Sequence, residues 1–185
     1  ALGSSTVAQT VQELTLKIGE KLDVRRFVKA TIDGEGTVGS YVHGGKIGVL
    51  VKVQTENADA TNNADFKELV NDLCLHIAAS DAKFMVASEI DEDYKNREAK
   101  VYEAQLKEQG KPEQMIPNII KGKLNKLASE ICLMEQKFVK NPDLSINKLV
   151  AEVEGKVGSK ISVLGFNKVN LGEGIEKKED NLADE

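Results

Sequence analysis

Apolar residues recur every three or four positions in several segments of the chain, the spacing typical of helices that bury one face. Helices are predicted at residues 5–18, 65–79, about 115–127 and 145–156. The first begins at a capping box, Thr6-x-x-Gln9, and stops at Gly19. The second has the broadest apolar face, and we expect it to be central and to pack against more than one neighbour.

A more charged helix is predicted from Asp91 to Gln109. It stops at Gly110-Lys111-Pro112, because glycine readily ends a helix and proline cannot continue one. The helix that follows carries Pro117 near its first turn, where the missing N–H does little harm. Two helices joined by so short a link predict an antiparallel helical hairpin that protrudes from the rest of the protein.

Runs of β-branched residues predict a hairpin early in the chain. Thr37–Val42 and Lys46–Val53 are joined by His43-Gly44-Gly45, a short glycine-containing link of the kind that connects antiparallel strands. The upstream run Val24–Ile32 also alternates, and Asp33-Gly34-Glu35-Gly36 follows it as a turn. These links are too short for parallel crossovers, so we expect a three-stranded antiparallel meander.

Three later segments are predicted to be extended: Phe84–Ala87, Ile131–Val139 and Lys160–Leu171. The polar stretch Thr55–Ala64 is predicted to be a surface loop, and it is our candidate for a subdomain boundary. Helices and strands in this order predict an α+β fold with two small antiparallel sheets.

Two subdomains follow from these elements. Residues 1–63 are predicted to form an N-terminal core subdomain of one helix and the three-stranded meander. Residues 64–185 are predicted to form a C-terminal core subdomain, with the helical hairpin inserted at about 91–130. At 185 residues the chain is long enough to bury a real core.

Composition narrows the class of protein. Hydrophobic residues make up 41% and charged residues 30%, as in soluble globular proteins. The net charge of −5 argues against direct nucleic-acid binding. The sequence has no secretory signal pattern and no apolar run near the roughly 20 residues of a membrane span. We therefore expect a cytoplasmic protein, or one of an organelle matrix or stroma, that does not bind membranes.

Cys74 and Cys132 are the only cysteines, and both lie in apolar, periodic segments. Such cysteines are usually small core residues in a reducing compartment. A disulfide between them, or a metal pair with His76, is the alternative, but the close C-x-x-C spacing that would support it is missing. No metal site is therefore predicted.

Catalytic motifs are also missing from the sequence. Its glycines match neither G-x-x-x-x-G-K-[ST] nor a strand-led G-x-G-x-x-G. His43 and His76 are the only histidines, and neither stands in a recognised catalytic motif with serine, cysteine or a carboxylate. We expect a binding protein with no catalytic residue and no cofactor. A small enzyme is the alternative, and a pocket with converging titratable groups would favour it.

Six segments, in the same order, resemble the elongation factor Ts family. The longest is Gly39–Val51, which resembles the family hairpin G-S-Y-x-H-x-x-x-x-G-V-L-V. The others are Lys17-Ile18-Gly19-Glu20 with Val24-Arg25-Arg26, His76-Ile77-Ala78-Ala79-Ser80, Gln109-Gly110-Lys111-Pro112, Gln136-Lys137-Phe138-Val139, and Val169–Lys177 with its G-E-G-I-E-K ending. Together they cover nearly the whole chain.

This resemblance implies a nucleotide exchange factor for elongation factor Tu, the GTPase that delivers aminoacyl-tRNA to the ribosome. A member of this family binds the GTPase, distorts its phosphate- and magnesium-binding region and speeds the release of GDP. Such a factor prefers the nucleotide-free GTPase, and by reciprocal linkage it weakens GDP binding.

The resemblance also implies which residues contact the GTPase: Ile47, Gly48, His76, Val139 and Lys140. Local patterns leave other roles open for four of them. Ile47 fits a core strand, and Gly48 fits a bulge or a close backbone approach. His76 fits a hydrogen-bonded packing residue on an apolar helix face. Val139 fits the end of a buried strand.

Two family features are missing from this sequence: the N-terminal helical domain and the T-D-F-V motif whose Phe wedges near the magnesium site. Asp65-Phe66 stands in N-A-D-F-K, after the hairpin instead of before it. We therefore expect a piece of the core with weaker binding and slower GDP release. An oligomerisation module that pairs with a second copy, without exchange activity, is the alternative.

Overall fold

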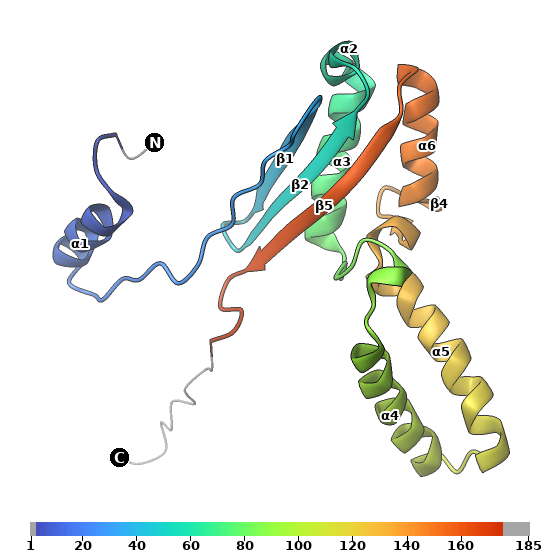
Figure 1. Cartoon of the computed structure of the whole chain (residues 1–185). Coiled ribbons are helices and arrows are strands. Elements are labelled where there is room, and N and C mark those ends of the chain that lie inside the picture. The colour runs from blue at the N-terminus through green and yellow to red at the C-terminus, as the bar shows by residue number, and fades with distance from the viewer. Residues whose placement is uncertain (1–2, 176–185) are drawn as a thin grey trace, which may run out of the picture.

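The computed structural model describes residues 3–175, so the Glu176-Lys177 end of the last motif and the acidic tail lie outside the described residues. Within them, a three-stranded sheet is backed by helix α3, with α6 beside it and a two-helix arm extending away (Figure 1). A second sheet has two strands. The predicted α+β class with two small antiparallel sheets and a helical hairpin is confirmed.

The larger sheet contains β1 (Gly36–His43), β2 (Ile47–Thr55) and β5 (Ile161–Asn170), in the order β1-β2-β5 with both pairs antiparallel. The predicted β1–β2 hairpin is confirmed. Its turn closes with a hydrogen bond from the Lys46 N–H to the His43 carbonyl, 2.9 Å. Gly44 and Gly45 both have positive φ, which glycine adopts without a steric penalty.

The predicted meander is wrong in its first strand. Residues 21–32 belong to no strand in the described structure, and Phe27 among them is 87% exposed. The third strand is β5, which pairs with β2 along its length. Alternation predicts an extended segment, but it does not specify the strand that will pair with it. Because β5 comes from beyond residue 63, the sheet draws on both predicted subdomains, and the division at that position stays a prediction.

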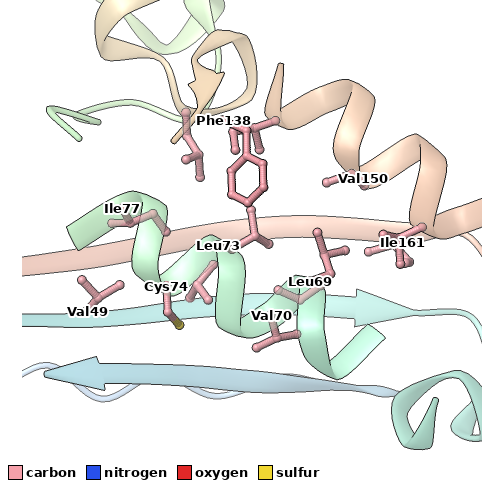
Figure 2. Packing of buried hydrophobic residues seen from close by; sticks show 14 of the residues in the cluster. Val49, Leu69, Val70, Leu73, Cys74, Ile77, Phe138, Val150 and Ile161 are labelled. Atoms are coloured by element: carbon pink, nitrogen blue, oxygen red, sulfur yellow. The ribbon is translucent and has the colours of Figure 1, made fainter. Parts of the chain in front are cut away.

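Helix α3 (Ala64–Ala79) covers one face of this sheet and is the central helix, as its broad apolar face predicts (Figure 2). It packs so closely that a Cβ at Gly39 of β1 would lie 2.5 Å from Val70 Cγ1. The main core is aliphatic apart from Phe66, Phe138, Cys74 and partly buried neighbours. The predicted loop 55–64 contains a short helix, α2 (Ala58–Asn62), because Asn57 caps it and Ala60 is buried.

Helix α6 (Ile146–Val157) also confirms its prediction; Ser145 caps its start and Gly158, with φ 68°, ends it. The predicted strand 131–139 is largely wrong. Helix α5 continues through Ile131, a 3₁₀ turn covers Leu133–Glu135, and only β3 (Lys137–Phe138) is a strand, paired with β4 (Asn141–Ser145). A short apolar run does not distinguish a buried helix end from a strand.

The arm consists of α4 (Glu92–Glu108) and α5 (Ile116–Ile131), with a short 3₁₀ turn, Glu113–Met115, between them. At its base, a small core contains Ile90, Ile131 and Cys132, and Phe84 and Tyr94 pack against it. The two aromatic rings meet edge to face, with their centroids 5.5 Å apart. Phe84 makes a single parallel bridge to Cys132, so the predicted extended piece 84–87 is short, and a 3₁₀ turn at Ala87–Glu89 follows.

Helix α1 (Val7–Ile18) has the predicted capping box and ends at Gly19, where φ is 79°. It buries none of its residues against the rest of the described chain. Across residues 3–175, no helix combines the length and the apolar character needed to cross a membrane.

Candidate partner-binding surface

The structure places the five predicted contact residues in two separate patches. Ile47 and Gly48 lie at the start of β2, and we call them, with their strand neighbours Val42 and Val169, the hairpin patch. His76, Val139 and Lys140 lie together at the end of α3, and we call them, with Gln136 and Asp72, the α3-end patch. The structure therefore gathers His76, Val139 and Lys140 in one patch and places Ile47 and Gly48 together in the other.

The hairpin patch lies partly on the sheet face opposite α3. Val49 is buried on the α3 side, and because strand residues alternate, Gly48 faces the other way. Gly48 pairs with Val42 on one side and Val169 on the other, and Val42 is 68% exposed. A Cβ on Gly48 would meet no atom of the described chain within 4 Å. The glycine therefore leaves an open recess between two valines.

Charged side chains of both signs surround this recess. A hollow of about 490 Å³ is lined by Ile47 and Gly48 together with the basic residues Arg25, Arg26 and Lys46 and the acidic residues Asp23 and Glu173. Arg26 forms an ion pair with Glu173, 3.4 Å, and Arg25 donates to the Glu173 and Gly174 carbonyls. The Ile47 side chain itself points to the other face and packs against the core. Ile47 is thus partly buried against the core and also lines the hollow.

His76 organises the α3-end patch. Its ring is 1% exposed and lies 6.2 Å from that of Phe138. The Val139 N–H donates to Nδ1, 3.3 Å, so Nδ1 is an acceptor and the proton is on Nε2. Nε2 donates to Gln136 Oε1, 2.8 Å, while the Gln136 amide donates to the Glu130 carbonyl. Burial lowers the pKa of His76, and the hydrogen bond with Gln136 partly offsets that effect.

Because His76 is buried, it is the hydrogen-bonded packing residue that its apolar helix face predicts. The exposed members of the patch are Val139, at 45%, and Lys140. Lys140 Nζ donates to Asp72 Oδ1, and this carboxylate raises the pKa of Lys140. His76 therefore holds the backbone that presents Val139, and Asp72 holds the ammonium group of Lys140.

A second hollow, of about 460 Å³, opens beside this patch. It lies between the ends of α3 and α5 and the segment 135–139, and its lining includes His76, Ser80, Gln136 and Val139. Ser80 Oγ is buried and has no hydrogen-bond partner among the described residues. A buried hydroxyl without a partner is uncommon in folded proteins.

Sequence reasoning missed three residues that shape these patches. Gln136 belongs to a recognised motif, so its signal was present. Asp72 stands four residues before His76 on α3, a spacing that places both on one helix face. Lys168, which donates to carbonyls at the end of α3, had no signal in the sequence because its contact joins distant segments.

The described structure gathers no three His, Cys, Asp or Glu side chains that could hold a metal ion within residues 3–175. Cys74 and Cys132 are both buried and free. Burial raises the pKa of the Cys74 thiol to about 11, so it is a poor nucleophile near neutral pH.

Comparison with known proteins covers the part of the chain that contains both patches. The family model described as elongation factor TS matches residues 1–173. Elongation factor Ts of Clostridioides difficile (strain 630) is 42% identical over 181 residues, which are 97% of this chain and 58% of that protein. Elongation factor Ts of Alkaliphilus oremlandii (strain OhILAs) is 42% identical over 154 residues, 83% of this chain and 71% of that protein.

A third relative, elongation factor Ts of Trichlorobacter lovleyi, is 39% identical over 183 residues, 98% of this chain and 58% of that protein. The chain thus spans less than two thirds of the length of several curated relatives, while the family match runs through both patches. From the family match and from these identities, we conclude that the chain belongs to the elongation factor Ts family.

Proposed function

We propose that this chain acts in translation elongation by binding elongation factor Tu and promoting release of its GDP. The observation that carries the proposal is the hydrogen-bonded unit of His76, Gln136 and Val139, in which two family motifs far apart in the sequence hold one exposed apolar side chain. An exposed valine on a backbone held by buried hydrogen bonds is a preorganised contact.

The two patches offer different chemistry to the GTPase. The hairpin patch combines an apolar row, Val42 and Val169, with the basic side chains of Arg25, Arg26 and Lys46. The α3-end patch offers Val139 and Lys140 beside a hollow. Contacts at both, made better with the nucleotide-free GTPase than with its GDP form, would weaken GDP binding by reciprocal linkage. No bond is made or broken by residues of this chain.

We further propose that these 185 residues release GDP more slowly than the longer relatives do. The sequence contains no T-D-F-V, so the phenylalanine that the family places near the magnesium site has no counterpart in it. The two patches can still supply binding, which predicts a larger loss in exchange rate than in affinity.

Fluorescent GDP preloaded on elongation factor Tu tests this proposal. Adding the chain should speed release, and titration calorimetry with nucleotide-free elongation factor Tu should show binding. Val139→Asp should weaken that binding about tenfold, because it places a charge in an apolar contact. Val101→Asp on α4, where the valine is 49% exposed, is the matched control and should bind normally. The absence of binding by the unaltered chain, or equal affinities of both variants, would refute the proposal.

Self-association is a second candidate function, and the uncovered sheet face favours it. Val42, Leu50 and Val169 lie on the face opposite α3, and Val42 and Val169 are exposed. Exposed apolar positions of this kind are typical of interaction sites. Sedimentation velocity should then detect a dimer that Val42→Asp dissociates. A monomer at all concentrations, with binding to elongation factor Tu intact, would exclude this function.

A further inference from the structure

Lys168 joins strand β5 to the end of helix α3. Its backbone pairs with Val49 of β2, so its side chain lies on the α3 face of the sheet. Its Nζ donates to the carbonyl oxygens of Ala78, 3.1 Å, and Ser80, 2.7 Å. One partly buried ammonium group thereby holds Ala78 and Ser80, which lie 90 and 88 positions before Lys168 in the sequence.

Helix α3 needs such a partner because of how it ends. Its cap residue Ser80 has φ −105° and ψ 168°, an extended conformation, whereas α1 and α6 end at left-handed glycines. A left-handed cap allows later N–H groups to bond the last carbonyls of a helix, and an extended cap leaves those carbonyls to other donors.

The basic residue in the last turn of α3 does not supply positive charge there. His76 accepts at Nδ1 and donates from Nε2, so its imidazole is neutral in this arrangement. The partial negative charge at a helix C-terminus is stabilised by a cation. Lys168 brings that cation from β5, and it bonds the carbonyls directly.

We propose that Lys168 is a positioning residue for the partner-binding surface, setting the α3-end patch in place relative to the hairpin patch; this inference rests on the proposed function. The backbone neighbour of Lys168 is Val169, a member of the hairpin patch that pairs with Gly48. Its ammonium group holds Ser80, four residues after His76, and Ser80 also lines the hollow beside Val139. One side chain thus connects the two patches without lying in the predicted contact set.

Two variants separate this role from simple loss of a lysine. Lys168→Met keeps the length of the side chain and removes the donor, whereas Lys168→Arg keeps charge and donors. Lys160→Met, at an exposed lysine just before β5, is the matched control. We expect Lys168→Met to weaken binding to elongation factor Tu roughly tenfold, and Lys168→Arg and Lys160→Met to bind within about twofold of the unaltered chain.

Amide hydrogen exchange reports on the positioning itself. The Ser80 N–H donates to the His76 carbonyl and the Val139 N–H to the His76 ring, so both amides sense the end of α3. Lys168→Met should speed their exchange about tenfold and leave the β1–β2 amides unchanged. If Lys168→Met does not fold, Lys168→Leu, which also removes the donor, takes its place. Unchanged exchange at Ser80 and Val139 would overturn the proposal.

A double-mutant cycle with Val139→Asp asks whether Lys168 acts through the α3-end patch. If it does, Lys168→Met should cost little further affinity, within about twofold, once Val139→Asp has disabled that patch. Losses that multiply would place the effect elsewhere and overturn the proposal. If the unaltered chain does not bind elongation factor Tu, the proposed function fails, while the exchange rates still decide whether Lys168 positions the patch.

Discussion

The Val139 N–H donates to Nδ1 of His76 across 3.3 Å, and this bond fixes the ring proton on Nε2, where it is shared with Gln136. Protonating the ring would put a second proton on Nδ1 and break the bond to Val139. The surface position of Val139 therefore depends on a neutral His76.

Acid should weaken this arrangement and the fold with it. Burial lowers the pKa of His76 in the folded protein below its usual 6.5. As the pH falls to 6.5 and below, the unfolded chain binds more protons at this histidine than the folded protein does. The stability that neutral His76 contributes is therefore complete above about pH 7.5 and is lost as the pH falls through 6.5 toward the folded pKa. We expect the thermal midpoint to fall between pH 7.5 and 5.5.

Two histidine variants identify the source of that loss. His76→Asn keeps an acceptor for the Val139 N–H and cannot titrate, so its midpoint should vary less over the same pH range. His43→Asn removes the other histidine, which is exposed, and should retain the full slope. Parallel pH profiles for the unaltered protein and His76→Asn would contradict the assignment.

Substituting Gly39 should destabilise the core. A Cβ at this position would lie 2.5 Å from Val70 Cγ1 and 2.9 Å from Cys74 Sγ, so α3 would have to move away from β1. We expect Gly39→Ala to lower the free energy of unfolding by about 1–3 kcal/mol, measured in urea. Gly48→Ala on the open face should change it by less than about 0.5 kcal/mol. Equal effects of both substitutions would contradict this packing.

Removing the arm should leave the core folded. Replacing residues 95–126 by a short glycine-serine linker retains Tyr94, Ile131 and Cys132 at the base. The same deletion removes both Leu106 and Ile116, which are buried in the arm. We expect a circular dichroism spectrum with less helix and a cooperative thermal transition. A collapsed spectrum would show that the core needs the arm.

The cysteines should react only when the protein unfolds. With the pKa of Cys74 raised to about 11, roughly 0.1% of it is thiolate at pH 8. Burial also raises the pKa of Cys132. Labelling by a maleimide at pH 8 should therefore be slow and should accelerate in step with urea unfolding. Fast labelling of the native protein would indicate that one of the sites opens readily.

Sequence reasoning succeeded where a structure is encoded by neighbouring residues. The β1–β2 turn was predictable because Gly44 and Gly45 permit positive φ, and α6 because its apolar residues recur at helical spacing. It failed at Val24–Ile32, where alternation predicted an extended segment but not its lack of a partner strand. It also failed at residues 131–139, where a short apolar run is equally consistent with a helix end.

The same contrast holds for the candidate site. The motifs pointed to His76 and Val139 as contacts, and the structure joins them with Gln136, which sequence reasoning missed, in one hydrogen-bonded unit. Motifs did not separate exposed residues from buried ones: His76 is 1% exposed, and the Ile47 side chain is partly buried against the core. Whether these residues contact elongation factor Tu stays a prediction.

By itself, the sequence determined the longer helices and the glycine turn, because each depends on the order of residues along a short stretch. It also indicated the family, through motifs spread along nearly the whole chain. Tertiary structure alone decided that β5 completes the sheet, that Asp72 holds Lys140 and that Lys168 holds the end of α3. The two lysine contacts join residues 68 to 90 positions apart, and the β2–β5 pairing joins two strands distant in the sequence. Such contacts form only when the folded core brings their segments together.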